Sequence, residues 1–354
     1  AGRNVESGVA PQGTDDGVSR LLGPIPGVRA YTQRAEGWPS DGGAMIYKSI
    51  LEAVGHTPLV RLNRVVRPGM ARVLVKYEAM NVGGSIKTRT ALRMVREAER
   101  QGRLHKGSII VEPTSGNQGI GLALVAAVLG YSARIIMPDS VSIERRRLVS
   151  QYGALVLTEH DDGDIGACIQ ACIARAQRMA AEDENVYVPQ QFENPANVVA
   201  QYEGTGAEIL ADADSPIDGF CSGVGTGGTI SGVGRALREA NPQTLIWAVE
   251  PDQAPVLSGG KVGTHLQMGI GDGIIPAILD RDIFDDVVTV SDSAAMGMAR
   301  SLAREEGLMC GITSGTNVVA ALRMAEQLGK GKTVVTVLPD TAERYISTQL
   351  FCEG

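Results

Sequence analysis

The fold follows from residues 219–237, which read GFCSGVGTGGTISGVGRAL. The apolar run ending near Ser222 predicts a buried strand, and the spacing of apolar residues through Leu237 predicts a helix. Between them, residues 223–229 form a glycine-rich turn. Glycines let backbone N–H groups close around a ligand, and the start of the next helix adds positive partial charge. The stretch therefore predicts a strand, a phosphate-binding loop and a helix.

The same glycines leave other interpretations open. Gly223, Gly225 and Gly228 satisfy the spacing G-x-G-x-x-G, and Glu250 ends the next predicted strand 22 residues after Gly228. A dinucleotide enzyme would hold a ribose there, so an NAD-dependent oxidoreductase is an alternative. In a third interpretation the glycines serve only the tight packing of the helix on the strand.

Short β-branched runs alternate with helical patterns along the rest of the chain. Strands are predicted at residues 73–77, 108–111, 134–137, 154–157, 186–188, 219–222, 244–249 and 333–337. Helices are predicted at residues 87–101, 118–129, 143–152 and 293–306, with Gly153 and Gly307 ending the last two. The alternation predicts an α/β fold of mainly parallel sheets covered by helices on both faces.

The chain length of 354 residues predicts two domains. Residues 1–44 lack periodicity and are rich in Gly, Pro, Ser, Asp and Arg, which predicts a disordered extension. The step Asn194-Pro195 is the expected domain crossing, because proline restricts the residue before it. We therefore expect a smaller domain at residues 45–194 and a larger one at 195–354.

Composition excludes several classes of protein. With 33 basic and 40 acidic residues the net charge is −7, which disfavours binding to nucleic acid or an anionic membrane. The five cysteines form no C-x-x-C pair, so neither a disulfide framework nor a metal site is expected, and a cytoplasmic location fits. The longest continuous apolar run, residues 120–129, is too short to span a bilayer.

Two more segments carry groups suited to chemistry. Residues 114–119, TSGNQG, place hydroxyls and an amide at a predicted helix start, which suits an amino-acid carboxylate or simply an N-cap. Residues 81–89, NVGGSIKTR, place Lys87 in the first turn of a helix. Positive helix-terminal potential disfavours the ammonium form and assists Schiff-base chemistry. The alternative is a solvated surface lysine.

Together these segments resemble a known family, the pyridoxal-phosphate (PLP) β-replacement enzymes of the cysteine synthase (O-acetylserine sulfhydrylase) and cystathionine β-synthase group. The matching segments, in order, are GHTPLVRL at 55–62, GSIK at 84–87, TSGN at 114–117, QQF at 190–192, NPAN at 194–197, GTGGT at 225–229 and PDTAERY at 339–345. The likeness covers about residues 46–351. It implies fold type II, similar to the tryptophan synthase β-subunit, with residues 59–80 packed on the larger domain.

The resemblance also implies roles for individual residues. Lys87 would form the internal aldimine, Asn117 would contact the 3′ oxygen of the cofactor, and Thr313 would face the pyridine nitrogen. The phosphate would be held by Gly225, Thr226, Gly227, Gly228 and Thr229. The substrate carboxylate would be bound by Thr114, Ser115, Gly116, Asn117, Gln118 and Gln191.

A hydroxyl at Thr313, usually serine in this family, has a chemical consequence. Without a carboxylate partner the pyridine nitrogen is not held protonated, and the ring is a weaker electron sink. Prompt loss of a β-substituent is then favoured, giving an aminoacrylate to which a nucleophile adds. The nominal reaction is L-cysteine synthesis from O-acetylserine and sulfide. The alternative is L-cysteine desulfhydration with release of hydrogen sulfide, or lanthionine or cystathionine formation.

Some positions depart from the family pattern. Gln118 stands where a threonine or another small residue is common, and Asp272 stands in a loop that commonly carries a small or aromatic residue. We expect Asp272 to receive the amino group or a proton of a second substrate, or else to be an exposed loop residue. By analogy the resemblance also implies a homodimer and a possible complex with serine acetyltransferase.

Overall fold

The computed structural model describes residues 46–163 and 165–351. From Tyr47 onward the chain forms one compact unit. The disorder predicted for residues 1–44 lies outside the described residues, and the boundary at Asn194-Pro195 stays a prediction.

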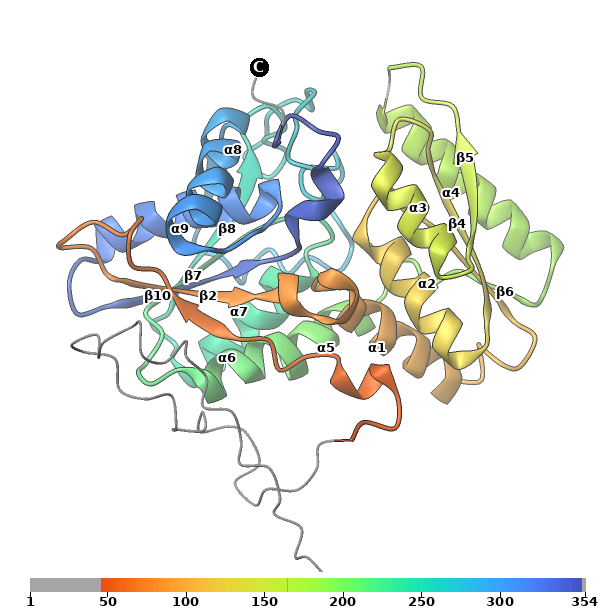
Figure 1. Cartoon of the computed structure of the whole chain (residues 1–354), viewed down its shortest axis with the longest axis horizontal. Coiled ribbons are helices and arrows are strands. Elements are labelled where there is room, and N and C mark those ends of the chain that lie inside the picture. The colour runs from red at the N-terminus through yellow and green to blue at the C-terminus, as the bar shows by residue number, and fades with distance from the viewer. Residues whose placement is uncertain (1–45, 164, 352–354) are drawn as a thin grey trace, which may run out of the picture. The chain divides into compact units, whose positions relative to one another are not determined.

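A six-stranded sheet is the larger of the two sheets (Figure 1). Its order is β1 (Leu59–Arg61), β2 (Arg72–Tyr77), β10 (Thr333–Leu338), β7 (Gly219–Gly223), β8 (Leu245–Pro251) and β9 (Asp286–Val290). All neighbours are parallel except β1 and β2, which pair antiparallel. The segment around residues 59–77 thus joins a sheet whose other strands all follow residue 218.

Helices cover both faces of this sheet. On β2, Val73 and Val75 pack into the core under α8 (Asp292–Ser301) and α9 (Ile312–Leu328). Leu74, between them, points to the opposite face and packs with α6 (Ala207–Asp212) and α7 (Gly228–Ala240). This alternation is the period-two pattern of a strand that is buried on both sides.

The second sheet has four parallel strands in the order β5 (Leu155–Glu159), β4 (Ser132–Pro138), β3 (Ile109–Pro113) and β6 (Val186–Tyr187). Its Ile110 face packs with α1 (Lys87–Arg100), α2 (Asn117–Leu129) and α3 (Ile143–Gln151). Its Val111 face packs with α4 (Ile165–Glu182). The α/β fold of parallel-rich sheets with helices on both faces is confirmed.

Shorter helical segments complete the described chain. They are α5 (Ala196–Ala200), 3₁₀ turns at Ile50–Ala53, Glu78–Met80, Val82–Gly84 and Ala342–Tyr345, and π turns at Gln201–Gly206 and Leu302–Glu306. The helix expected at 293–306 is therefore regular only to Ser301. None of the helices in the described parts of the chain combines the length and apolar character needed to cross a membrane.

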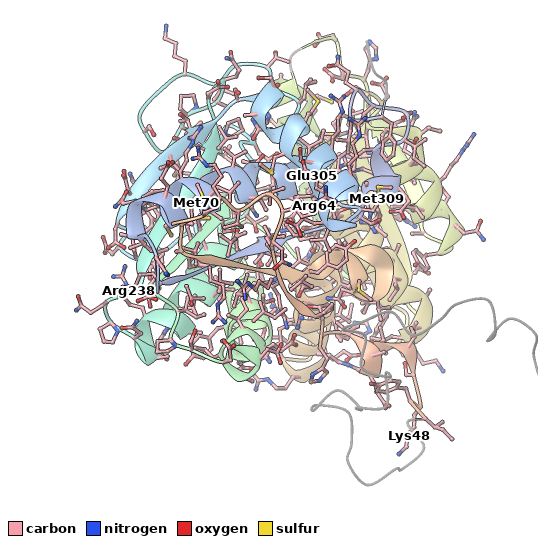
Figure 2. The ribbon with its side chains drawn as sticks, turned by 60° about the vertical axis from the view of Figure 1, so that its left-hand side comes forward. Lys48, Arg64, Met70, Arg238, Glu305 and Met309 are labelled. Atoms are coloured by element: carbon pink, nitrogen blue, oxygen red, sulfur yellow. The ribbon has the colours of Figure 1, made fainter. Side chains whose placement is uncertain are left out.

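The edge strand β1 is held by a contact that sequence patterns did not predict. Glu306 accepts hydrogen bonds from the backbone N–H groups of Asn63, Arg64 and Val65 at 2.9, 2.5 and 3.0 Å. Figure 2 labels Arg64, one of these three residues. The last turn after α8 therefore fixes the chain that leaves β1.

Candidate active site

A pocket lies where parallel strands of both sheets end. It is lined by residues that directly follow β3 and β7, by the end of β4, and by the start of the segment after β10. Ligands of α/β proteins bind at the carboxyl ends of strands, because the loops that start there are free to diverge from the sheet. The topology thus gathers segments that are far apart in the sequence.

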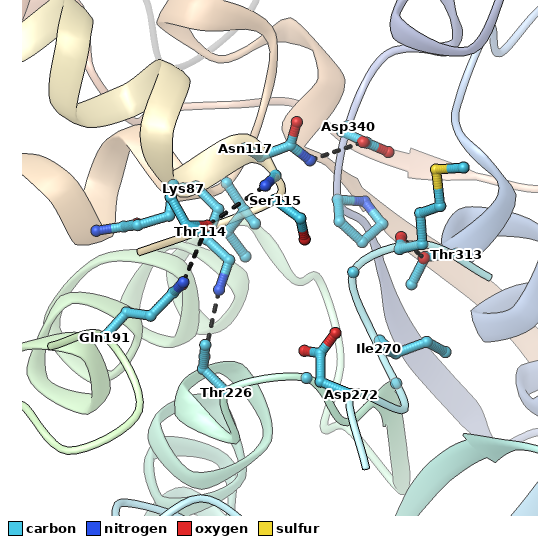
Figure 3. Close-up of a pocket in the computed structure, with 18 of the residues that line it drawn as sticks. Lys87, Thr114, Ser115, Asn117, Gln191, Thr226, Ile270, Asp272, Thr313 and Asp340 are labelled. Atoms are coloured by element: carbon cyan, nitrogen blue, oxygen red, sulfur yellow. Dashed lines mark hydrogen bonds between the residues drawn. The ribbon is translucent and has the colours of Figure 1, made fainter. Parts of the chain in front are cut away.

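Lys87 stands in the wall of this pocket at the start of α1. Gly83 and Gly84, with φ of 76° and 70°, make the turn that delivers it. Its Nζ donates a hydrogen bond to Thr226 Oγ1 at 3.2 Å (Figure 3). Burial lowers the pKa of Lys87 to about 8, against the opposing charges of Asp272 and Glu112. A lysine in this state is a competent nucleophile and base near neutral pH.

The glycine-rich loop after β7 forms a cradle without side chains. A Cβ on Gly225 would lie 2.2 Å from the carbonyl oxygen of Gly269, and one on Gly228 would lie 2.1 Å from Asn197 Oδ1. Gly227 has φ of 80°, and no described side chain caps the start of α7. The first N–H groups of α7 are therefore available to an anion, and a phosphate fits this donor set.

The turn after β3 presents hydroxyl and amide groups to the same pocket. Thr114 Oγ1 accepts hydrogen bonds from the backbone N–H of Gly116 at 3.3 Å and from Gln191 Nε2 at 3.1 Å. Ser115 lines the pocket beside them. Asn117, in the first turn of α2, donates to Asp340 Oδ2 at 2.7 Å (Figure 3). This arrangement offers a carboxylate several donors at a helix start.

Gln118 also lines the pocket, but it is 1% exposed. Its Nε2 contacts Met94 Sδ at 3.4 Å, and its Oε1 has no hydrogen-bond partner among the described residues. Most of this side chain therefore packs against α1 rather than facing the pocket.

Glu112, the last residue before Pro113, holds the neighbouring turn at Gln190 and Gln191 in place. Its carboxylate accepts the backbone N–H groups of Gln190 and Gln191 at 2.9 and 3.0 Å. Burial raises the pKa of Glu112 to about 7, although these donors and the charge of Lys87 oppose the shift. Sequence reasoning did not single out Glu112, because its partners lie more than seventy residues away.

Thr313 and Asp272 stand on the side of the larger sheet. Thr313, in the first turn of α9, donates its hydroxyl to the carbonyl oxygen of Met268 at 3.1 Å. Asp272 lies four residues further along the same loop and points its carboxylate into the pocket (Figure 3). Burial raises the pKa of Asp272, while the charges of Lys87, His265 and Arg145 oppose the shift.

The structure brings almost all of the sequence-predicted site residues to this one pocket. Gly228 lies behind the cradle against Asn197 instead of lining it. Glu250, the residue of the dinucleotide interpretation, is 2% exposed and accepts the N–H groups of Leu257 and Ser258. The pocket wall also contains Arg145, which no sequence pattern indicated.

The fold and the site together define the class of protein. It is an α/β enzyme whose buried lysine lies between an anion cradle and a turn rich in hydrogen-bond donors. A family model described as "pyridoxal-phosphate dependent enzyme" matches residues 50–340, so the chain belongs to that family. The cofactor is pyridoxal phosphate, which excludes the dinucleotide interpretation.

Individual known proteins show which members of this family the chain resembles. A cysteine synthase of Staphylococcus aureus is 48% identical over 305 residues, which are 86% of this chain and 96% of the relative. The crystal structure of an O-ureido-L-serine synthase is 40% identical with a TM-score of 0.81, covering 87% of this chain and 97% of that one. A hydrogen sulfide-producing enzyme from Fusobacterium nucleatum is 38% identical with a TM-score of 0.80, covering 85% and 98%. The predicted kinship with cysteine synthases is confirmed.

Proposed function

We propose that this enzyme catalyses β-replacement on a serine or cysteine derivative, nominally the formation of L-cysteine from O-acetylserine and sulfide. The observation that carries the proposal is the position of Lys87 Nζ, which is bonded to the cradle residue Thr226 and shares a pocket with the turn at Thr114. Only a reaction in which a lysine acts between a phosphate and an amino-acid carboxylate requires the lysine, the cradle and the turn together.

The residues divide the work as follows. Pyridoxal phosphate, when bound, supplies an electron sink beside the substrate Cα. Residues 225–229 would hold its phosphate through backbone N–H groups and the start of α7, and Lys87 would be its covalent anchor. Asn117 and Thr313 would hold its ring oxygen and nitrogen.

The substrate carboxylate binds to residues 114–117 and to Gln191, whose amide already rests on Thr114. That contact holds Cα within reach of Lys87. Burial lowers the pKa of Lys87, which favours the neutral amine that would accept the α-proton. Acetate then leaves with the Cβ–O electron pair, sulfide adds at Cβ, and the proton returns to Cα. The reaction is redox-neutral.

The experiment is to mix the purified holoenzyme separately with O-acetylserine, O-phosphoserine, serine and cysteine. We expect O-acetylserine to change the visible spectrum of the cofactor rapidly and sulfide to restore it. No spectral change with any of the four compounds would overturn the proposal.

Borohydride reduction followed by peptide mapping tests the anchor. We expect the cofactor label on Lys87. Lys76 is an internal control, because it is fully buried but paired with Glu208 and Asp212 at 3.0 Å each. A label on Lys76, or none on Lys87, contradicts the assignment.

Asp272 favours a second activity at the same site, the release of hydrogen sulfide from L-cysteine or the formation of a thioether such as lanthionine or cystathionine. Its carboxylate faces the pocket close enough to Lys87 for the two charges to interact. A carboxylate whose pKa is raised by burial can accept a proton from an incoming nucleophile.

Replacing Asp272 by alanine or asparagine tests this role. We expect sulfide release from L-cysteine to fall by roughly 100-fold, the usual effect of removing a general base. Asp252→Asn is the matched control, because Asp252 is exposed and lies outside the pocket lining. Undiminished release in Asp272→Ala would remove Asp272 from the reaction.

We further propose a homodimer with independent active sites, acting in the cytoplasm. Kinship with cysteine synthases supports these assignments. Light scattering of the holoenzyme tests the dimer, and co-purification with a serine acetyltransferase would test that partnership.

A further inference from the structure

The segment that follows β10 holds two buried charged side chains that the reaction above does not use. They are Asp340 and Arg344, which are 1% and 3% exposed. The segment pairs with the glycine turn that precedes Lys87, because the N–H of Thr341 donates to the carbonyl oxygen of Gly84 at 3.1 Å. The two charges therefore lie beside the turn that delivers the lysine.

Both charged side chains bind the amide of Asn117, one at each end. Asn117 Nδ2 donates a hydrogen bond to Asp340 Oδ2 at 2.7 Å (Figure 3), and Asn117 Oδ1 accepts one from Arg344 Nη1. Arg344 also donates through Nη2 to the carbonyl oxygen of Gly83. One guanidinium thus joins Asn117 to the turn that leads to Lys87.

The chemistry of these two partners leaves the amide of Asn117 a single orientation. An ionised carboxylate only accepts hydrogen bonds, and a guanidinium only donates them. If the amide turned over, its oxygen would face the Asp340 carboxylate and its NH₂ group would face Arg344, so both hydrogen bonds would be lost. Nδ2 carries two N–H groups and Asp340 uses one, so one donor is left for a ligand in the pocket that Asn117 lines.

The carboxylate of Asp340 is itself held in place. Its Oδ2 also accepts a hydrogen bond from the Tyr345 hydroxyl at 2.7 Å, and the Arg145 guanidinium lies over the Tyr345 ring at 4.9 Å. Its Oδ1 has no hydrogen-bond partner among the described residues and lies 2.2 Å from where a Cβ on Gly311 would stand. Asp340 therefore has little room to move away from Asn117.

We propose that Asp340 and Arg344 are positioning residues, which fix the Asn117 amide as a hydrogen-bond donor toward the ring oxygen of pyridoxal phosphate. The inference rests on the proposed contact between Asn117 and that oxygen, and it adds the residues that set the direction of the contact. A hydrogen bond donated to this oxygen favours its ionised form. The bound cofactor absorbs in the visible range when the oxygen is ionised and in the near ultraviolet when it is protonated. The spectrum therefore reports the contact independently of turnover.

The test measures the ratio of visible to near-ultraviolet absorbance of the holoenzyme. We expect Asp340→Ala and Arg344→Met each to lower this ratio roughly 2- to 10-fold, the effect of weakening one hydrogen bond. Asp340→Asn keeps an acceptor and Arg344→Lys keeps a donor, so each of these should retain a larger part of the ratio. Glu343→Ala, at an exposed position of the same turn, should leave the ratio unaltered.

A cycle of double variants with Asn117→Ala separates positioning from folding. In the Asn117→Ala background the ring oxygen has already lost its donor, so Asp340→Ala and Arg344→Met should lower the ratio no further. Tyr345→Phe removes a hydrogen bond to Asp340 but leaves the one from Asn117. It should lower the unfolding temperature without changing the ratio.

Two outcomes overturn the inference alone. One is a ratio that stays at the wild-type value in Asp340→Ala and Arg344→Met although it falls in Asn117→Ala. The other is an equal lowering of the ratio in the wild-type and Asn117→Ala backgrounds, which indicates a general loss of structure. If Asn117→Ala itself leaves the ratio unaltered, the proposed contact with the ring oxygen fails and the inference fails with it. Failure of the proposed β-replacement is seen separately, as the absence of any spectral change when O-acetylserine is added to the wild type.

Discussion

Glu112 illustrates how a single buried side chain fixes a turn of the backbone, here the one at Gln190 and Gln191. Gln190 has φ of 60°, a left-handed backbone conformation that is uncommon outside glycine. Glu112 accepts the N–H groups of Gln190 and Gln191, and so holds this turn in place. The result is that the Gln191 side chain reaches Thr114. Glu112 therefore positions the side chain of Gln191, a proposed substrate-binding residue, without itself lining the pocket.

The pKa of Glu112 predicts a specific pH dependence of stability. Burial raises that pKa from 4.5 to about 7, so between these values the native state holds a proton that the unfolded state has released. Stability contributed by this group therefore falls as pH rises from 4.5 to 7. Relative to Glu112→Gln, which does not titrate, we expect the wild type to lose about 3 kcal/mol across this window.

Thermal or urea unfolding at several pH values measures this difference. Glu184→Gln is the matched control, because Glu184 is exposed on the nearby turn before β6. Parallel stability profiles of wild type and Glu112→Gln would contradict the raised pKa.

At the residue scale, the sequence could predict functional residues that lie in a recognisable local motif. It could not predict residues whose role depends on contacts with distant parts of the chain. A glycine turn leading into a helix marks Lys87 as a candidate, and hydroxyls and amides at a helix start mark Thr114, while their roles come from the family resemblance. Glu112 and Arg145 have no such local signal, since a glutamate or arginine in a strand or helix is usually exposed. Only the fold brings Glu112 to Gln191 and Arg145 to Met268.

At the scale of elements, the packing of α7 on α5 decides the geometry of the cradle. Gly228, at the start of α7, touches Asn197 of α5. Asn197 in turn donates to Thr226 Oγ1 and to the carbonyl oxygen of Gln191, both at 2.9 Å. One asparagine thus links the glycine-rich loop to the segment that carries Gln191.

Gly228→Ala tests this link. The added Cβ would lie 2.1 Å from Asn197 Oδ1, so Asn197 and Thr226 must shift. We expect a loss of stability of about 1–3 kcal/mol from overpacking and a weakening of cofactor binding by roughly 10-fold or more. Cofactor absorbance retained after dialysis and the unfolding temperature measure the two effects.

Gly297→Ala is the matched control for this substitution. Gly297 lies within α8, and nothing stands within 4 Å of its added Cβ. There, alanine should stabilise the protein by about 0.5–1 kcal/mol. Unaltered cofactor retention in Gly228→Ala would show that the cradle does not depend on this contact.

Some strands and helices could not be predicted from the sequence, for physical reasons. Strand β9 follows β8 through residues 252–285, which contain no helix, so the alternation of strands and helices gives no signal there. Helix α9 begins with a glycine-rich segment that is typical of a loop. Gly315 is needed inside it because a Cβ would lie 1.9 Å from the carbonyl oxygen of Ala295 on α8. Close helix packing, rather than a turn, explains this glycine.

At the scale of the whole molecule, a buried ion cluster connects the helix of Lys87 to the larger sheet. Arg89, on α1, pairs with Glu78 at 2.8 Å and with Glu208 of α6 at 2.6 Å. Glu208 also pairs with Lys76 of β2 at 3.0 Å. Sequence could predict α1 and β2 themselves, but not this cluster, because Glu208 lies 119 residues from Arg89 along the chain. The cluster fixes α1, and with it the position of Lys87.

The cluster predicts a second pH dependence, opposite in sign to that of Glu112. Hydrogen bonding and charge from Arg89 outweigh desolvation and lower the pKa of Glu208 from 4.5 to about 2. The unfolded state therefore binds this proton first as pH falls, so the contribution of Glu208 is complete above pH 4.5 and is lost as pH falls through 2. We expect wild type to lose at most about 3 kcal/mol more than Glu208→Gln across this window.

Glu203→Gln, which removes an exposed ion pair with Arg93, should change stability by less than about 1 kcal/mol. Urea unfolding between pH 2 and 5 measures both variants, and equal effects of the two substitutions would mean that the buried cluster does not hold α1 in place.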